Sequence, residues 1–330
     1  MSRVTIYSIA RELGISASTV SRAFSRPELV RADVREQIMT EADRLGYTPN
    51  RAARGLATGR AGIIGLLVPD ITNPFFPPLV RAVEQAAGER DVAVLLVDAG
   101  SNGAAEPRLV RQLAAQVDGL VIASPRAPSA ALKEAVAGVR TVVVNRTIQG
   151  LPAVICDNTG ALREAADHLV GHGHKKLALL RGPATSWAAG RRAQAVRRWA
   201  DERGVELVEL GPFEAQFEDG QAAARVLVES GATGILAFDD LMAAGVVSGL
   251  AELGVHAPAD VSVVGCDDVL LARTMTPALT TVTAPIDQLG RQAIELLGQV
   301  VSGEPVRSVR LEGVLTVRGT TGPAPRRHRG

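Results

Sequence analysis

Aromatic residues, cysteines and long apolar runs are all scarce in this chain of 330 residues. Aromatic residues make up 3% of the sequence, and there are two cysteines, Cys156 and Cys266. Two cysteines are too few for a disulfide framework, and the apolar sequence around each favours a buried thiol in a reducing compartment. No stretch reaches the ~18 apolar residues of a membrane span. The first residues also lack the apolar core of a signal peptide, so we expect a cytoplasmic protein with no membrane association.

Net charge is nearly absent as well, at +1 from 36 Lys and Arg against 35 Asp and Glu. This balance excludes a wholly basic nucleic-acid binder, and the 46% hydrophobic content excludes a disordered chain. The charge is unevenly distributed, because residues 1–60 hold 10 Arg against 6 acids, residues 61–325 hold 23 basic against 29 acidic residues, and residues 326–330 add three Arg. A basic head and tail therefore flank an acidic body, which indicates contact with a polyanion at one end.

Residues 1–48 predict two short helices joined by a tight turn, and then a third helix. Thr5 stands at an N-cap position, and apolar residues recur at helical spacing as far as Leu13, before a glycine. Ser16 is expected to cap a second helix that runs through Phe24, and a third amphipathic helix is expected over about 31–45. This pattern is typical of a helix-turn-helix, whose second helix lies in the DNA major groove. An ordinary small helical bundle is the alternative.

The segment 49–60 predicts a short helix, a hinge helix, that orders only against a partner. Gly55 costs ~1 kcal/mol relative to Ala in a helix interior, and an isolated helix of this length is marginal. Arg51 and Arg54 suit phosphates, whereas Leu56 has no local core to enter, which fits a wedge between base steps in the minor groove. A flexible linker is the alternative. Residues 321–330 are expected to form a basic, disordered tail.

From residue 61 the pattern alternates between apolar runs and helical stretches. Strands are expected at 63–68, 92–97, 120–122, 141–144, 177–180, 205–210, 235–238, 261–266 and 307–317. Helices are expected near 79–89, 106–115, 130–137, 159–171, 188–203 and 286–301. The order repeats βαβ units twice, so the fold class is α/β with two parallel-sheet lobes and a small all-α N-terminal domain. Ligands bind outside the carboxyl ends of such strands, which makes the cleft between the lobes the expected ligand site.

Several stretches resemble the LacI/GalR family of bacterial transcriptional regulators. In the head they are Thr5-Ile6-Tyr7-Ser8-Ile9-Ala10, Ser18-Thr19-Val20-Ser21-Arg22 and Leu45-Gly46-Tyr47-Thr48-Pro49-Asn50, within a match that has no gap from Val4 to Ala57. In the body they are Val68-Pro69-Asp70-Ile71-Thr72-Asn73, the turn Gly171-His172-Gly173-His174, and Pro258-Ala259-Asp260-Val261-Ser262-Val263-Val264-Gly265. The resemblance covers almost all of residues 4–320 and extends to the periplasmic sugar-binding proteins that share the two-lobed fold.

For the head, the resemblance implies binding to a palindromic double-stranded DNA operator with a central CG step. It implies base contacts from Ala17, Ser18 and Arg22, and insertion of Leu56 at the operator centre. A bidentate contact from an arginine to guanine supplies ~1–3 kcal/mol of discrimination, so Arg22 is the expected specificity residue. Arg31 departs from the family, which often has a Ser or Asp cap there. The full set of expected DNA-binding residues is Thr5, Tyr7, Ser16, Ala17, Ser18, Thr19, Ser21, Arg22, Tyr47, Asn50, Arg51, Ala53, Arg54 and Leu56.

For the body, the resemblance implies lobe 1 at about 61–156 and 286–312 and lobe 2 at about 157–285 and 313–320. The effector-binding residues that it implies are Asn73, Phe75, Phe76, Asn145, Arg146, Trp187, Arg192, Phe213, Asp239 and Asp267. Aromatic faces suit a sugar ring or a base, although packing in the lobe core is the alternative for each. Phe217 is an alternative to Phe213. Asp239 stands where the family usually has Asn, and its charge favours a hydroxyl-rich or cationic ligand.

Together these features predict a ligand-controlled, homodimeric transcriptional repressor of a sugar or catabolic operon. Dimerisation is expected through lobe 1, near 79–87. Enzyme motifs are lacking, and His168, His172 and His174 lack the acids of a metal site, so no enzyme activity, cofactor or metal is expected. A solute-binding protein without DNA function and a regulator that needs a co-repressor are the alternatives.

Overall fold

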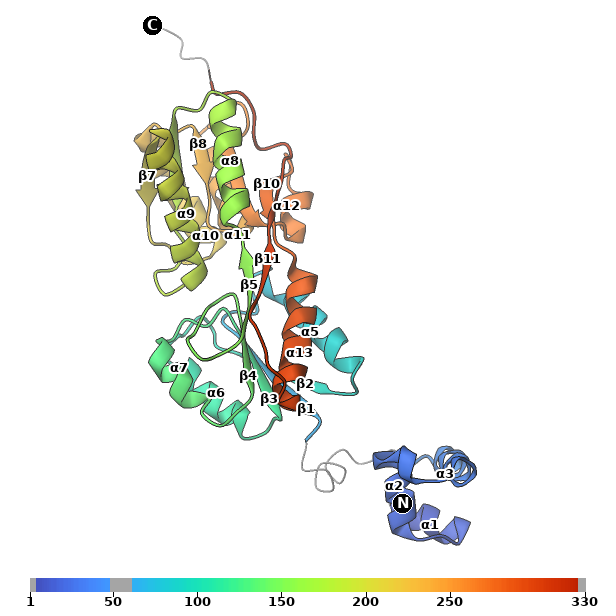
Figure 1. Cartoon of the computed structure of the whole chain (residues 1–330). Helices are drawn as coiled ribbons and strands as arrows, with labels where there is room; N and C mark the ends of the chain where they lie inside the picture. Colours follow the sequence, from blue (N-terminus) through green and yellow to red (C-terminus); the bar gives the residue numbers. More distant parts are fainter. Residues whose placement is uncertain (1–3, 48–60, 326–330) are drawn as a thin grey trace, which may run out of the picture. The chain divides into compact units, whose positions relative to one another are not determined.

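The computed structural model describes residues 4–47 and 61–325. These belong to two compact units, residues 1–63 and residues 64–330, which are taken separately below. Figure 1 shows the course of the chain with its element labels.

The first unit is a three-helix domain. It consists of α1 (Ile6–Leu13), α2 (Ala17–Ser25), the 3-10 turn η1 (Pro27–Leu29) and α3 (Ala32–Leu45). Its core is small, with Ile9, Val20 and Ile38 fully buried where the three α-helices meet. The helix α1 ends at Gly14, which adopts the left-handed backbone (φ 66°) that glycine tolerates without steric cost.

The helix α3 begins without a side-chain cap. Arg31 occupies the N-cap position, and its guanidinium instead donates two hydrogen bonds to Asp33, at 3.1 and 2.6 Å. These bonds lower the pKa of Asp33, which keeps a negative charge in the first turn, where the helix dipole favours one. At the start of α3, the negative charge of Asp33 in the first turn thus takes the place of a side-chain cap at Arg31.

Lobe 1 of the second unit is built on a six-stranded sheet in the order β11-β5-β4-β3-β1-β2. The strands are β1 (Ile63–Val68), β2 (Ala93–Asp98), β3 (Gly119–Ala123), β4 (Thr141–Val144), β5 (Ala153–Asp157) and β11 (Val309–Glu312). The helices α5 (Phe76–Gly88) and α13 (Ile286–Ser302) cover one face, and α6 (Glu106–Ala114) and α7 (Ser129–Ala135) cover the other. Strands buried on both faces explain the continuous apolar runs in the sequence.

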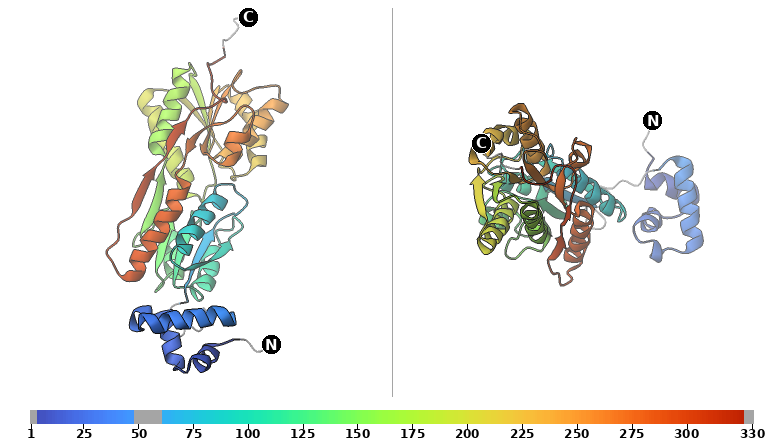
Figure 2. Two further views of the ribbon diagram at one scale, coloured as in Figure 1. Left: turned by 90° about the vertical axis from the view of Figure 1, so that its right-hand side faces the viewer. Right: turned by 90° about the horizontal axis from the view of Figure 1, so that it is seen from above.

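Lobe 2 has a second six-stranded sheet, in the order β12-β10-β9-β8-β6-β7, in which β12 alone runs antiparallel to its neighbour β10. Its strands are β6 (Lys176–Leu180), β7 (Glu206–Leu210), β8 (Gly234–Leu236), β9 (Ser262–Asp267), β10 (Thr280–Thr283) and β12 (Val314–Thr316). One face carries α8 (Thr159–Gly171) and α9 (Trp187–Arg203), and the other carries α10 (Phe217–Ser230) and α11 (Asp240–Glu252), with α12 (Leu270–Thr274) beside them. Figure 2 shows both lobes from two further sides.

The chain passes between the lobes three times, after β5, after β10 and after β11. The prediction of one strand over 307–317 is wrong, because the chain leaves the sheet of lobe 1 after Glu312 and joins that of lobe 2 at Val314. Gly313 lies at the crossing, where a Cβ atom would overlap the side chain of Asn158. The sequence patterns also missed α10, α11, α12, β5 and β10.

The helix α5 has a buried and an exposed face: Leu79, Val83 and Ala86 lie in the core of lobe 1, whereas Arg81, Glu84 and Gln85 are exposed. Dimerisation near 79–87 stays a prediction, and one further expectation is corrected. The first part of the tail is ordered rather than disordered, since Gly322 donates to Ser262 Oγ at 3.0 Å and Ala324 N donates to a main-chain oxygen of the α8 turn at 2.8 Å. Residues 326–330 lie outside the described residues.

Candidate functional site

The outer face of α2 carries the side chains expected to read bases. Ser16 caps the helix by accepting a hydrogen bond from Thr19 N at 3.1 Å, and Val20 turns into the core. Ser18 and Arg22 are exposed one turn apart, and Arg22 Nη2 donates to Ser18 Oγ at 3.4 Å. The helix therefore presents a guanidinium and a hydroxyl side by side, the groups that recognise base edges in a major groove.

The other residues expected to contact DNA occupy different settings. Thr5 forms a capping box with Ser8 at the start of α1, and Tyr7 is 67% exposed. Tyr47 is half-buried, with its ring packed on Phe24 at a centroid distance of 5.5 Å. Ala17, Thr19 and Ser21 are half-buried along α2. The predicted hinge helix over 49–60 lies outside the described residues. So do the remaining residues expected to contact DNA, which are Asn50, Arg51, Ala53, Arg54 and Leu56.

A cavity of about 610 Å³, counting the space open to solvent, lies between the two lobes. The residues that line it come from the loops that follow the carboxyl ends of strands in both sheets, where the parallel α/β fold places ligands. Seven of the ten expected effector-binding residues line this cavity: Asn73, Phe75, Phe76, Asn145, Arg192, Asp239 and Asp267. Phe75 and Phe76 also belong to the core of lobe 1, with their rings edge to face at 5.2 Å, so both interpretations of these aromatics apply.

The other three expected residues do not line this cavity. The guanidinium of Arg146 is turned away to the 125–129 loop, where it donates to two carbonyl oxygens and to Ser129 Oγ. Trp187 lines a neighbouring cavity of about 410 Å³ and packs against the core of lobe 1. Phe213 packs against the core of lobe 2, and Phe217 begins α10, so neither phenylalanine lines the main cavity.

Sequence reasoning missed a third aromatic side chain of the cavity and most of its polar rim. Phe238 follows β8, although the sequence pattern placed it inside a strand. The missed polar residues are Asp70, Ser101, Ser124, Arg126, Ser186, Glu214 and Gln216. The signal that would have found many of them is position, because Asp70, Ser101 and Ser124 each stand within three residues of a strand's carboxyl end.

The backbone of the cavity wall is strained in several places. Ser101, Ser124, Asn145 and Asp267 have φ values of 60°, 44°, 57° and 114°, in a region that non-glycine residues rarely adopt. Strain of this kind persists where the surrounding structure over-determines it, and it concentrates at ligand sites. All four residues line the cavity, which supports its assignment as the functional site of the second unit.

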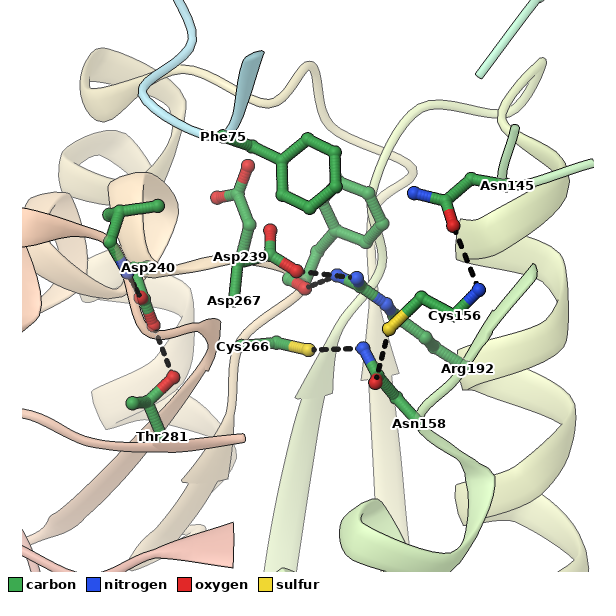
Figure 3. A network of polar contacts seen from close by, with 12 residues as sticks. Phe75, Asn145, Cys156, Asn158, Arg192, Asp239, Asp240, Cys266, Asp267 and Thr281 are labelled. Atoms are coloured by element: carbon green, nitrogen blue, oxygen red, sulfur yellow. Dashed lines mark hydrogen bonds and ion pairs between the residues drawn. The ribbon is translucent and has the colours of Figure 1, made fainter. Parts of the chain in front are cut away.

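Arg192 is the centre of the polar network in the cavity (Figure 3). Its Nη2 donates to Asp267 Oδ1 at 2.7 Å, and its Nη1 donates to the carbonyl oxygen of Phe238 at 2.5 Å. The guanidinium also lies over the Phe238 ring, 4.9 Å from its centroid. A residue of α9 thereby joins the ends of β8 and β9 into one rigid wall.

Three polar contacts bridge the lobes across the cavity. Asn73 of lobe 1 donates through Nδ2 to Asp239 Oδ2 at 3.0 Å and to the carbonyl oxygen of Ala215 at 3.4 Å, both in lobe 2, and Arg126 of lobe 1 forms an ion pair with Glu214 of lobe 2 at 3.1 Å. Asp239 also caps α11 by accepting from Met242 N at 2.8 Å. The relative position of the lobes is therefore coupled to the groups that line the cavity.

Carboxyl groups at the cavity wall have altered pKa values. Burial raises the pKa of Asp267 to about 6, although the positive charge of Arg192 opposes the shift. Burial, with the neighbouring charge of Asp267, raises the pKa of Asp240 to about 7, while Thr281 and the backbone of Val269 donate to its carboxyl. Burial likewise raises the pKa of Asp239.

Asn158, which follows β5 at the first crossing between the lobes, links the two thiols. Cys156 Sγ donates to Asn158 Oδ1 at 3.0 Å, and Asn158 Nδ2 donates to Cys266 Sγ at 3.1 Å. Burial raises the pKa of Cys156 to about 12 and that of Cys266 well above its ordinary value. Both groups are therefore protonated hydrogen-bonding residues rather than nucleophiles at neutral pH.

Within residues 4–47 and 61–325, no group of three or more His, Cys, Asp or Glu side chains is arranged to hold a metal ion. No helix of these ranges is both long and apolar enough to cross a membrane.

The two units define the class of the protein: a helix-turn-helix DNA-binding domain joined to a two-lobed ligand-binding domain. Residues 5–50 match the family model described as bacterial regulatory proteins, lacI family, and residues 166–321 match the periplasmic binding protein-like domain. The chain belongs to the LacI family and is a ligand-responsive, sequence-specific DNA-binding transcriptional regulator.

Full-length relatives and solved structures agree with this assignment. The chain is 31% identical to a ribose operon repressor of Halalkalibacterium halodurans, over 96% of this chain and 97% of the relative. It is 29% identical to the catabolite control protein A of Streptococcus mutans, over 96% and 98%. It superimposes on the lac repressor dimer bound to operator and the anti-inducer ONPF with a TM-score of 0.87 and 28% identity, over 97% and 100% of the two chains. These relatives are regulators rather than enzymes.

Proposed function

We propose that this protein is a homodimeric repressor that binds a palindromic operator through α2 and releases it when a sugar-like effector fills the cavity between the lobes. One observation carries the proposal: the chain combines an exposed pair of base-reading side chains, Ser18 and Arg22, with an aromatic, polar cavity bridged by contacts between two lobes. The likeness to a ribose operon repressor and to a family member solved with bound ribose supports a sugar-like effector.

In the DNA complex, Arg22 contacts a guanine, Ala17 and Ser18 contact neighbouring bases, and Thr5, Ser16, Thr19 and Ser21 hold phosphates. A capped α2 supports these roles, because the cap at Ser16 leaves the first turn of the helix free to approach the groove. We further propose phosphate contacts from Asn50, Arg51 and Arg54, and minor-groove insertion of Leu56.

In the effector complex, the ring of the ligand lies against Phe75 and Phe238, and its hydroxyls bond to Asn145, Arg192 and Asp267. Polar groups fixed by a surrounding network select a ligand by orientation. Because Asn73 and Asp239 join the lobes, a ligand that bonds to either residue changes how the lobes are held together. Because the two binding equilibria are linked, the ligand lowers the affinity for the operator by a certain factor, and the operator lowers the affinity for the ligand by the same factor.

The ligand is bound and released unchanged, and the cytoplasm, where the DNA lies, is the proposed site of action. A solute-binding protein without DNA function finds no support, since the DNA-binding family model covers residues 5–50. A co-repressor mode differs only in the sign of the ligand effect, which the test below reads directly.

The proposal is tested by fluorescence anisotropy with palindromic duplexes that have a central CG step, at about 50 and 200 mM salt. Arg22→Ala should relax the preference between duplexes that differ at one G·C pair by about tenfold, as expected for one lost bidentate contact. Arg35→Ala is the matched control, because Arg35 is exposed on α3 and should leave that preference unchanged. Equal sequence preference in the wild type and the Arg22→Ala variant contradicts the assignment of α2.

A further inference from the structure

The charges in the cavity between the lobes are unbalanced. Four carboxylates line it, from Asp70, Glu214, Asp239 and Asp267, against two guanidiniums, from Arg126 and Arg192. Each guanidinium already has a carboxylate partner: Arg192 is paired with Asp267 at 2.7 Å, and Arg126 with Glu214 at 3.1 Å. The cavity thus offers an incoming anion no cation that is free of a carboxylate.

Asp70 and Asp239 are the two carboxyl groups that remain. Among the described residues, no lysine, arginine or histidine forms an ion pair with either of them. The carboxyl of Asp70 lies at the edge of the cavity, where Thr72 and Ser101 donate to it. These bonds to neutral groups lower its pKa, so Asp70 keeps its charge at neutral pH.

Asp239 is the deeper of the two, with 3% of its surface exposed. Met242 N donates to its Oδ1 at 2.8 Å and Asn73 Nδ2 donates to its Oδ2 at 3.0 Å, and the backbone of Leu241 also bonds to the carboxyl. A carboxylate has about four acceptor positions, so a position remains for a ligand. Figure 3 shows Asp239 in the same part of the cavity as Phe75, Asp267 and Arg192.

Burying a carboxylate without a counter-charge is costly, and the cost falls when a cation is placed against it. A ligand ammonium at Asp239 supplies that cation, whereas a ligand carboxylate or phosphate adds a further negative charge. The aromatic side chains of Phe75, Phe76 and Phe238 supply the apolar surface that a sugar ring needs on its face.

We propose that the effector of this protein is an amino sugar or a similar polyhydroxylated amine, whose protonated nitrogen lies against Asp239. This inference rests on the proposed function and narrows its ligand class. Neutral sugars of the same shape bind more weakly, and sugar acids and sugar phosphates are excluded by the surplus negative charge.

The test uses the full chain and matched sets of ligands at pH 7. D-glucosamine, D-galactosamine and D-mannosamine are compared with their parent hexoses and the corresponding hexuronates by calorimetric titration. At least one amino sugar should bind ten times more tightly than its parent hexose, and that hexose at least ten times more tightly than its uronate. Tenfold corresponds to 1.4 kcal/mol.

Asp239→Asn is the decisive variant, because Asn also caps helices well. Its one side-chain oxygen still accepts from Met242 N, while the bond from Asn73 to the second carboxylate oxygen is lost for every ligand alike. It should bring amine and parent hexose to within twofold of each other. Asp201→Asn removes the same charge from an exposed position of α9 and should keep the tenfold preference. If the Asp239→Asn variant keeps the full preference for the amine, Asp239 acts only as a helix cap and the proposal is overturned.

A hexuronate that binds as tightly as its amine also overturns it, as does a panel in which no member binds. Operator binding, measured on the same preparations, separates the two levels of failure. Specific operator binding without the expected ligand preference defeats this inference alone, whereas loss of specific operator binding defeats the proposed function.

Discussion

Replacing Arg192 with Met tests the polar network that holds the cavity wall. Arg192 donates to Asp267 and to the carbonyl of Phe238, and methionine keeps much of the apolar stem while removing the charge and both hydrogen bonds. Arg191→Met is the matched control, since Arg191 is the next residue of α9, is exposed, and bonds to Gln194.

The expected loss of stability follows from the pKa of Asp267. With Arg192 present, burial raises that pKa from 3.8 to about 6, which costs about 3 kcal/mol relative to the unfolded chain. Without Arg192 the pKa of Asp267 rises further, and the carboxyl takes up a proton in the folded protein. The cost of burying Asp267 relative to the unfolded chain then cannot exceed the cost of protonating that carboxyl at pH 7, which is about 4 kcal/mol. The carboxyl thus contributes about 1 kcal/mol to the change, and the lost hydrogen bond to Phe238 contributes about 1 more. We expect Arg192→Met to lower the free energy of unfolding of lobe 2 by about 2 kcal/mol.

The difference should shrink as the pH falls. In both proteins the folded-state pKa of Asp267 lies above its unfolded value, so its contribution is most favourable at low pH and is lost as the pH rises through that interval. In the Arg192→Met variant, the interval between the unfolded-state and the folded-state pKa of Asp267 extends to higher pH. At pH 5 the carboxyl is protonated in both proteins, so only the hydrogen-bond difference of about 1 kcal/mol remains.

Urea unfolding followed by tryptophan fluorescence measures this difference, because both tryptophans, Trp187 and Trp199, lie on α9 of lobe 2. If Arg192→Met and Arg191→Met are equally stable at pH 7, or if the gap between them widens at pH 5, the reasoning about Asp267 is refuted.

Four further variants test other parts of the structure. Gly245→Ala should destabilise lobe 2 by about 3 kcal/mol, because its Cβ would overlap the backbone of α10. Gly298→Ala, at an open position of α13, should instead stabilise lobe 1 by about 0.5–1 kcal/mol. Urea unfolding measures both variants, and equal effects on stability would contradict the packing of α10 against α11. Ser16→Ala should lower the stability of the three-helix domain by about 1 kcal/mol, because the cap of α2 is lost. Faster amide hydrogen exchange in α2 would show this loss, and unchanged exchange would contradict it. Burial lowers the pKa of His174, so its contribution is complete above pH 6.5 and is lost as the pH falls, by up to about 1.4 kcal/mol per pH unit. His174→Gln should therefore unfold with a smaller loss of stability between pH 7 and 5 than the wild type, and an equal loss would contradict this.

The regular elements of the lobes were predictable because their strands are short, continuous apolar runs. The bounds of β1 and β4 match the predicted ranges of 63–68 and 141–144. The helix α11 was missed for a physical reason: Met242, Val246 and Leu250 are buried along with the small residues between them, so the sequence lacks the alternation of polar and apolar faces. The strand pattern did not show the split of β11 and β12, because a strand that changes sheets keeps its pattern on both sides of Gly313. The lobe bounds implied by the resemblance did divide the chain between residues 312 and 313.

The candidate site was predictable in position and only partly in detail. The family resemblance implied Asn73, Asn145 and Asp267, and all three line the cavity because parallel strands bring their carboxyl ends to one edge. The direction of a side chain within a loop depends on tertiary contacts, which is why Arg146 turns to the 125–129 loop and Phe238 rather than Phe213 faces the cavity. The ion pair between Arg126 and Glu214 joins residues 88 positions apart, and no local pattern indicates it.

The most direct test of the account is a measurement of coupling between the two sites. Operator affinity is measured by anisotropy with and without a saturating sugar, taken as the panel member that binds most tightly. Affinity for the same sugar is then measured calorimetrically with and without saturating operator. The account predicts that the two ratios differ from one and are equal within error. A sugar that binds in the cavity while operator affinity stays unchanged would contradict it.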